Sequence, residues 1–169
     1  YIKRENYLAP AALARLVEDG AVVFVKYAVE RADPANDAYL DAVVAAAGRE
    51  RVASGMGETP VPDHIGRRNL ATFTSGAVCI APRAANALLR LYRSGAVDAG
   101  AAAIAPFIAF EQLRARLGGI QVLHAAIAAA GIAETGPLLP MLSNVRAEHA
   151  AAVQSAVDAL VAAERSARA

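Results

Sequence analysis

The residue in this chain best suited to covalent chemistry is Lys26, which closes the uncharged run of residues 21–25 (Ala-Val-Val-Phe-Val). A lysine amine that loses its charge on desolvation becomes a nucleophile toward a carbonyl carbon. A short, continuously apolar run is typical of a strand that is buried on both faces. The pattern therefore predicts a buried strand with an amine at its carboxyl end. The alternative is a lysine whose stem covers apolar surface while its ammonium reaches solvent.

Other reactive or small residues stand where neighbouring strands are expected to end. They are Tyr1, the pair Ser54-Gly55 and the run Thr74-Ser75-Gly76. In parallel α/β folds the carboxyl ends of the strands meet at one edge, so these residues would lie near Lys26. Such a set suits imine chemistry, in which the amine attacks, the phenol moves protons and the glycines leave room for the adduct. The alternative is a strand-end aromatic with ordinary turn glycines.

The elements that would position these residues follow from the spacing of apolar residues. Strands are predicted at residues 21–25, 51–55 and 70–76, and Tyr1 is read as the end of a fourth. Helices are predicted at residues 9–18, 36–47 and 82–92, with a short helix or turn at 62–68. This alternation favours βαβ units and a parallel sheet. Beyond Gly95 only helices are expected, at residues 97–117, 120–130 and 144–167.

Composition excludes several classes of protein. The formal net charge is +1, from 17 basic and 16 acidic residues, which gives no reason to expect a nucleic acid or a membrane as partner. Cys79 is the single cysteine, so an internal disulfide framework is excluded and a cytoplasmic location is favoured. The uncharged stretch of residues 117–133 is interpreted as a buried helix and not a membrane span. The three histidines have no metal-like spacing, so no metal is expected.

The order of these features resembles the dihydrodipicolinate synthase / N-acetylneuraminate lyase superfamily. Tyr1 and Lys26 resemble its fifth-strand tyrosine and sixth-strand lysine, with Leu8-Ala9-Pro10 between them. Ser54-Gly55 resembles the seventh strand, and Phe73-Thr74-Ser75-Gly76 with Ala81-Pro82 resembles the eighth strand and the helix that follows. The three-helix tail resembles the C-terminal helices of that superfamily.

The resemblance implies a fold, an activity and a site. The expected fold is α/β, the C-terminal half of a (β/α)8 TIM barrel, with strands 5–8 in residues 1–95 and a helical extension in residues 96–169. The expected activity is that of a lyase or aldolase that forms a Schiff base with pyruvate or a related 2-oxo acid. Lys26 would form the imine, so no cofactor is expected, and Tyr1 would relay protons. Arg4, Gly55, Thr74 and Ser75 would bind the substrate. The superfamily also implies a homo-oligomer, either a dimer or a tetramer.

Departures from the superfamily pattern bear on its branch. The usual Tyr-Asn-x-Pro motif is replaced by Tyr1-Ile2-Lys3-Arg4, and the spacing from Tyr1 to Pro10 is short. Both features favour a sugar-acid dehydratase branch over lysine biosynthesis. The carboxylate-binding motif of the superfamily belongs to an earlier strand, so four strands are expected upstream of Tyr1. Two alternatives remain: a noncatalytic relative that binds a ligand or assists assembly, and a small α/β interaction domain with an oligomerising tail.

Overall fold

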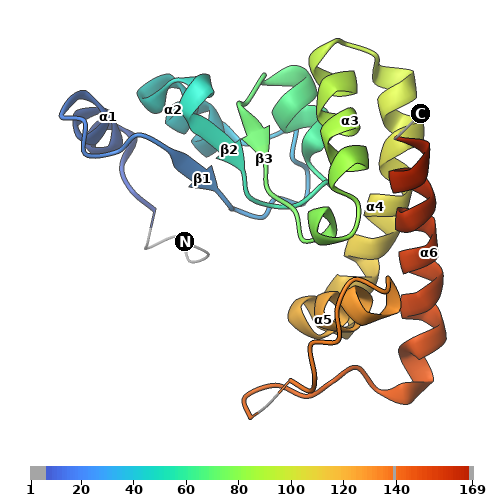
Figure 1. Cartoon of the computed structure of the whole chain (residues 1–169). Coiled ribbons are helices and arrows are strands. Elements are labelled where there is room, and N and C mark those ends of the chain that lie inside the picture. Colours follow the sequence, from blue (N-terminus) through green and yellow to red (C-terminus); the bar gives the residue numbers. More distant parts are fainter. Residues whose placement is uncertain (1–6, 139, 168–169) are drawn as a thin grey trace. The chain divides into compact units, whose positions relative to one another are not determined.

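The computed structural model describes residues 7–138 and 140–167, and the chain divides into two compact units (Figure 1). The first unit comprises residues up to Ser75 together with Tyr92–Val97. The second comprises Gly76–Leu91 and Asp98–Ala169. Each unit is described by itself below.

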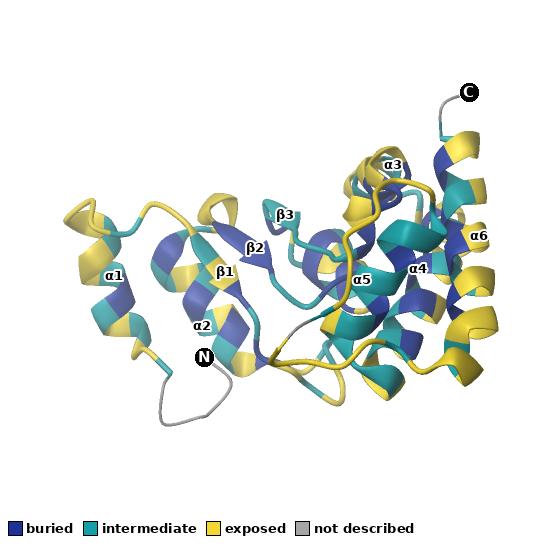
Figure 2. Cartoon of the chain, turned by 60° about the horizontal axis from the view of Figure 1, so that its bottom comes forward, coloured by how far each residue is buried: buried dark blue, intermediate teal, exposed yellow. Residues whose placement is uncertain are grey.

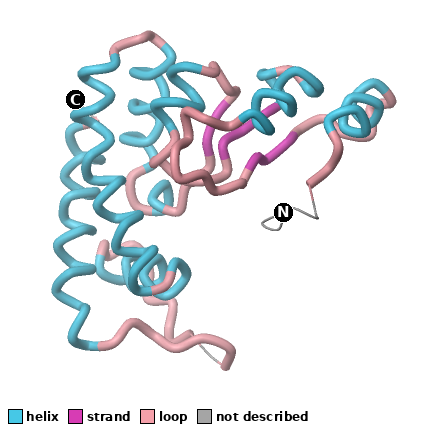
Figure 3. Tube along the Cα trace, turned by 180° about the vertical axis from the view of Figure 1, so that it is seen from behind, coloured by secondary structure: helices cyan, strands magenta, loops and turns pink. Residues whose placement is uncertain are grey.

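The first unit contains a small parallel sheet of three short strands, drawn in magenta in Figure 3. Its strands are β1 (Val25–Tyr27), β2 (Val52–Ser54) and β3 (Thr72–Phe73), in the order β1-β2-β3. Lys26 pairs with Ala53, and Ala53 pairs with Thr72. The central strand is completely buried, as expected for the middle of a parallel sheet.

Two helices of this unit, α1 (Pro10–Glu18) and α2 (Ala38–Ala47), pack against each other. Pro10 opens α1 because its missing N–H would have no partner in a first turn. Asp37 caps α2, since its carboxylate accepts a hydrogen bond of 3.1 Å from the backbone N–H of Leu40. Gly48 ends α2 at a φ of 82°, a conformation that favours glycine. The 3-10 helix η2 (Arg49–Arg51) and the π-helix η3 (Pro62–Arg67) flank β2.

The second unit is built from helices. They are η4 (Ala77–Cys79), most of α3 (Pro82–Arg93), α4 (Val97–Leu117), α5 (Gly119–Ala129), η5 (Ala147–His149) and α6 (Ala150–Ser166). Buried residues are dark blue in Figure 2 and occur along these helices. Phe107 and Phe110 of α4 and Leu160 of α6 are among the buried residues. Such residues recur at helical spacing, which is the pattern that the sequence shows. In the described part of the chain, none of the helices combines the length and hydropathy that a bilayer crossing requires.

The expected fold class, half of a (β/α)8 barrel with strands 5–8, is wrong. Over residues 7–138 and 140–167 the structure shows a three-stranded parallel sheet in a mainly helical chain. Alternating strand and helix patterns occur in every parallel α/β fold, so the alternation could not by itself establish a barrel. The fourth expected strand rested on Tyr1, which lies outside the described residues.

The helices agree with the predicted ranges more closely than the strands do. Residues 21–24 precede β1, and Val23 and Phe24 are largely exposed, so the expected strand at 21–25 is misplaced and not buried. Continuous apolarity is compatible with a strand but does not fix its register. Pro106 lies inside α4, which runs unbroken from Val97 to Leu117.

Candidate functional site

Side-chain alternation along the sheet separates two sets of residues. Lys26, Ala53 and Thr72 stand side by side in the register, whereas Tyr27, Ser54 and Phe73 form the adjacent row. Successive side chains of a strand point to opposite faces, so the two rows belong to opposite faces of the sheet. Lys26 is exposed and Tyr27 is buried. The amine therefore belongs to an accessible face of a strand and not to the end of a buried one.

Gly55 lies directly against Lys26. A Cβ atom added at Gly55 would come 3.0 Å from Cγ of Lys26 and 2.8 Å from the backbone oxygen of Tyr27. Real Cβ atoms essentially never approach a backbone atom below 3.0 Å, so only glycine fits here without a shift of the chain. The structure thus brings together two of the residues that the sequence singled out.

The remaining expected site residues have different outcomes. Thr74 continues the β2–β3 ladder, because its N–H donates a hydrogen bond of 2.8 Å to the backbone oxygen of Ser54. Both Thr74 and Ser75 are half-buried. Tyr1 and Arg4 lie outside the described residues. Their expected roles in proton relay and substrate binding stay predictions.

Tyr27, the residue that follows Lys26 in β1, belongs to a buried polar network. The hydroxyl of Tyr27 donates a hydrogen bond of 2.6 Å to Oδ2 of Asp37. The guanidinium of Arg31 forms an ion pair of 3.1 Å with Oδ1 of the same carboxylate. The side chain of Asp37 has no exposed surface, so both partners compensate its desolvation. This network ties the loop after β1 to the start of α2.

Burial and the hydrogen bonds of this network shift the pKa values of Asp37 and Tyr27. Burial would raise the pKa of Asp37, but hydrogen bonds from Tyr27, Leu40 and Arg31 hold that pKa below its ordinary value. Burial, together with the hydrogen bond to Asp37, raises the pKa of Tyr27 above its ordinary value. The phenol therefore stays protonated and the carboxylate stays ionised at neutral pH.

A second buried pair links β2 to η3. Nδ1 of His64 lies 2.8 Å from Oγ of Ser54, and the His64 ring meets the Tyr27 ring edge-on at 6.2 Å between centroids. Burial lowers the pKa of His64 to about 4, and the positive charge of Arg68 adds to the effect. His64 is therefore neutral at pH 7, with one ring nitrogen as donor and the other as acceptor.

His64 is not among the site residues expected from the sequence. The signal in the sequence was Ser54 at a strand end, followed ten residues later by a histidine in a short helical turn. Nothing in the spacing required the two side chains to meet; the π-helix η3 decides this by turning His64 back onto β2. Across residues 7–138 and 140–167, no group of three His, Cys, Asp or Glu side chains could hold a metal ion.

Comparison with known proteins gives a likeness to a solved structure. No family model matches the chain, and no curated protein does. The solved structure of "PhdJ bound to substrate intermediate" matches 94% of this chain with a TM-score of 0.65 and 21% sequence identity. The match covers 50% of that protein, so this chain spans half the length of the structure that it matches. The likeness establishes a shared fold over that half.

Proposed function

We propose that this chain is part of a Schiff-base lyase in which Lys26 forms an imine with the keto carbon of pyruvate or a related 2-oxo acid. The amine would add to the carbonyl, and water would leave as the imine forms. The bond then made or broken would be a C–C or a C–O bond. The observation that carries the proposal is the position of Lys26, exposed on the sheet and flanked by Gly55. An adduct on the amine needs this access.

The use of basic residues supports this choice. The chain contains fifteen arginines but only two lysines, Lys3 and Lys26. Arginine supplies nearly all the positive charge, and it stays protonated in proteins, so it cannot attack a carbonyl. A lysine at position 26 would provide a nucleophilic amine that an arginine could not provide there.

The shared fold also supports the proposal. The matched protein was solved bound to a substrate intermediate, and it shares this fold over half its length. We extend an enzymatic role from that protein to this chain. A 2-oxo sugar acid is the preferred substrate class, following the sequence departures at Tyr1-Ile2-Lys3-Arg4. Tyr1 as proton relay, Arg4 as a substrate ligand and assembly into a dimer or tetramer belong to the same proposal.

The test is reductive trapping. The protein is incubated with pyruvate and sodium borohydride, and in parallel with a 4-deoxy-5-oxo sugar acid, and its intact mass is measured. We expect one adduct that maps to the peptide containing Lys26. The Lys26→Arg variant keeps the charge but lacks a nucleophilic amine, so it should remain unlabelled.

The matched control is Lys3→Arg, which removes the other lysine and should label like the parent. Equal labelling of the parent and the Lys26→Arg variant would show nonspecific reaction and contradict the proposal. Complete absence of label with both acids would favour a noncatalytic role. In that case Lys26 would serve β1, which stands at one end of the described sheet, as a charge that discourages pairing with other strands.

A further inference from the structure

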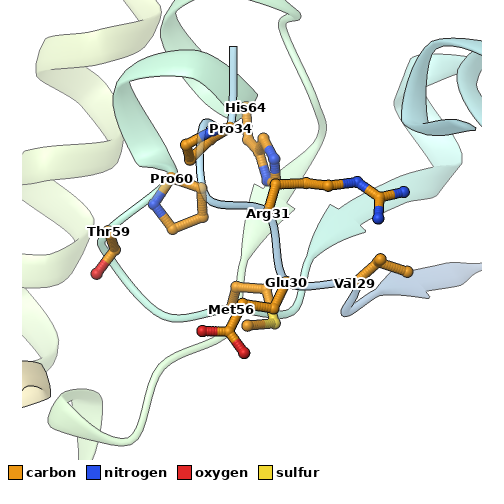
Figure 4. Close-up of a pocket in the computed structure, with 8 residues that line it drawn as sticks. All are labelled: Val29, Glu30, Arg31, Pro34, Met56, Thr59, Pro60 and His64. Atoms are coloured by element: carbon orange, nitrogen blue, oxygen red, sulfur yellow. The ribbon is translucent and has the colours of Figure 1, made fainter. Parts of the chain in front are cut away.

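A cavity of about 140 Å³ opens beyond the carboxyl ends of β1 and β2 in the first unit (Figure 4). Val29 and Arg31 reach it from the segment after β1, and Met56, Pro60 and His64 reach it from the segment after β2. Ligands of parallel α/β sheets bind outside the carboxyl ends of the strands, so this position favours a binding site.

The walls of the cavity are largely apolar and held in place. Val29, Met56 and the rings of Pro34 and Pro60 face the space. The Arg68 guanidinium donates a hydrogen bond of 3.0 Å to the backbone oxygen of Pro34, and this bond holds Pro34 in place. A dry apolar cavity of roughly 150 Å³ can hold a benzene-sized molecule. The size and lining of this cavity therefore suit a single six-membered ring.

One buried polar side chain, that of His64, lines the cavity. His64 is only 2% exposed and lines the space, and its Nδ1 is engaged by Ser54. In the described part of the chain, His64 Nδ1 is the one hydrogen-bond partner that Ser54 Oγ has. A buried hydroxyl hydrogen without an acceptor is costly, so Ser54 donates to Nδ1. Nε2 of the neutral ring then carries the proton and has no hydrogen-bond partner among the described residues.

The charges around the cavity favour an uncharged ligand over an anion. The Arg31 guanidinium points away from the cavity in Figure 4 and is paired with Asp37. Glu30 is exposed, and its carboxylate lies beside Met56 at the opening. A negatively charged ligand would meet this carboxylate, and the cation that lines the described cavity, Arg31, is already paired with Asp37. An uncharged ligand avoids the repulsion.

We propose that this cavity is a binding site for an uncharged molecule of about one six-membered ring that carries a hydrogen-bond acceptor for Nε2 of His64. The site is separate from the imine chemistry proposed for Lys26. The residues that line the cavity come after the ends of β1 and β2 in the sequence. Lys26 instead lies within β1, on the face of the sheet opposite to Tyr27. The cavity would recognise the apolar ring of the ligand and one acceptor oxygen on it.

Tetrahydropyran and cyclohexane are the matched probes. They have the same ring size, but only tetrahydropyran has an acceptor oxygen, and neither has a carbonyl that could react with Lys26. The two methionines, Met56 in the cavity and Met141 at 89% exposure, supply internal reporters. In the full 169-residue chain with ¹³C-labelled methionine methyl groups, titration should shift the Met56 signal and leave Met141 unchanged.

The expected result is a preference for tetrahydropyran of about three- to tenfold, the effect of one net hydrogen bond. A His64→Phe variant should abolish that preference while cyclohexane binding persists. Thr59 is exposed at the opening, so Thr59→Phe should block both probes without loss of the fold. This second variant keeps the test decisive if His64→Phe does not fold. Equal affinity of the two probes, an unchanged preference in His64→Phe or no response at Met56 would overturn the proposal.

Discussion

The hydroxyl of Tyr27 donates a 2.6 Å hydrogen bond to Asp37, a carboxylate that also caps α2. This bond fixes the face of the sheet on which Tyr27 stands. Because side chains alternate along a strand, it also fixes Lys26 on the other face. A slip of β1 by one residue would bury the lysine and expose the phenol. The network of Tyr27, Asp37 and Arg31 therefore positions the candidate nucleophile without contacting it.

Removing this hydroxyl tests the positioning role. Tyr27→Phe leaves Asp37 without one of its donors in a fully buried place, so we expect a loss of about 1–3 kcal/mol in the free energy of unfolding. Tyr39→Phe is the matched control, because the Tyr39 hydroxyl donates to the backbone oxygen of Leu8 at an exposed position. Urea denaturation compares the two variants. A cost for Tyr27→Phe no larger than that of the control would contradict the role of the network.

The space at Gly55 gives a second prediction. Gly55→Ala would force a Cβ into the backbone oxygen of Tyr27 and the stem of Lys26. We expect a loss of about 1–3 kcal/mol from this overpacking, together with slower trapping of the proposed imine. Gly119→Ala is a suitable control, because its nearest new contact is an ordinary 3.6 Å to an Arg114 nitrogen. Full stability of Gly55→Ala in urea would show that the close approach is not required.

The acid dependence of stability follows from His64. Its pKa falls from 6.5 to about 4 on folding, so between these values the unfolded chain binds a proton that the folded chain does not. The free energy of unfolding should therefore decrease by about 3 kcal/mol as the pH falls from 6.5 to 4. The stabilising effect of Asp37 is present above its ordinary pKa and is lost only as the pH falls below about 4, because its pKa is lowered.

His64→Gln isolates this contribution, since an amide can still hydrogen-bond to Ser54 but does not titrate. Unfolding free energies measured at several pH values from 7 to 4 should give a flatter curve for His64→Gln than for the parent. His149→Gln, at a partly exposed side chain, is the control. Parallel curves for the parent and His64→Gln would mean that His64 is not responsible for the slope.

In the second unit, Glu164 of α6 caps the start of α3. Its Oε2 accepts hydrogen bonds of 2.8 Å from the N–H of Arg83 and 3.0 Å from that of Ala84. Glu164→Ala leaves both amides without an acceptor, so we expect a loss of about 2 kcal/mol in urea denaturation. Glu148→Ala removes an exposed ion pair and should stay within about 0.5 kcal/mol of the parent. Similar costs for the two variants would refute the capping role.

The helices could be predicted from the sequence because their signals are local. The range predicted at residues 97–117 is the observed α4, and the helix predicted at 82–92 is observed at Pro82–Arg93. Apolar spacing and the proline at the start of α3 lie within a few turns of the chain. The strands were harder to predict, because an apolar run such as residues 21–25 does not by itself specify a strand. Strand pairing also depends on residues that are far away in the chain.

The sequence by itself determined which residues could do chemistry: one lysine at an apolar run, and small residues and hydroxyls at the neighbouring strand ends. Only the tertiary structure decided their geometry. Pairing of β1 with β2 set Lys26 beside Gly55, and η3 turned His64 onto Ser54. Residue type fixes reactivity locally, whereas proximity, burial and the resulting charge state arise from contacts between segments far apart in the chain.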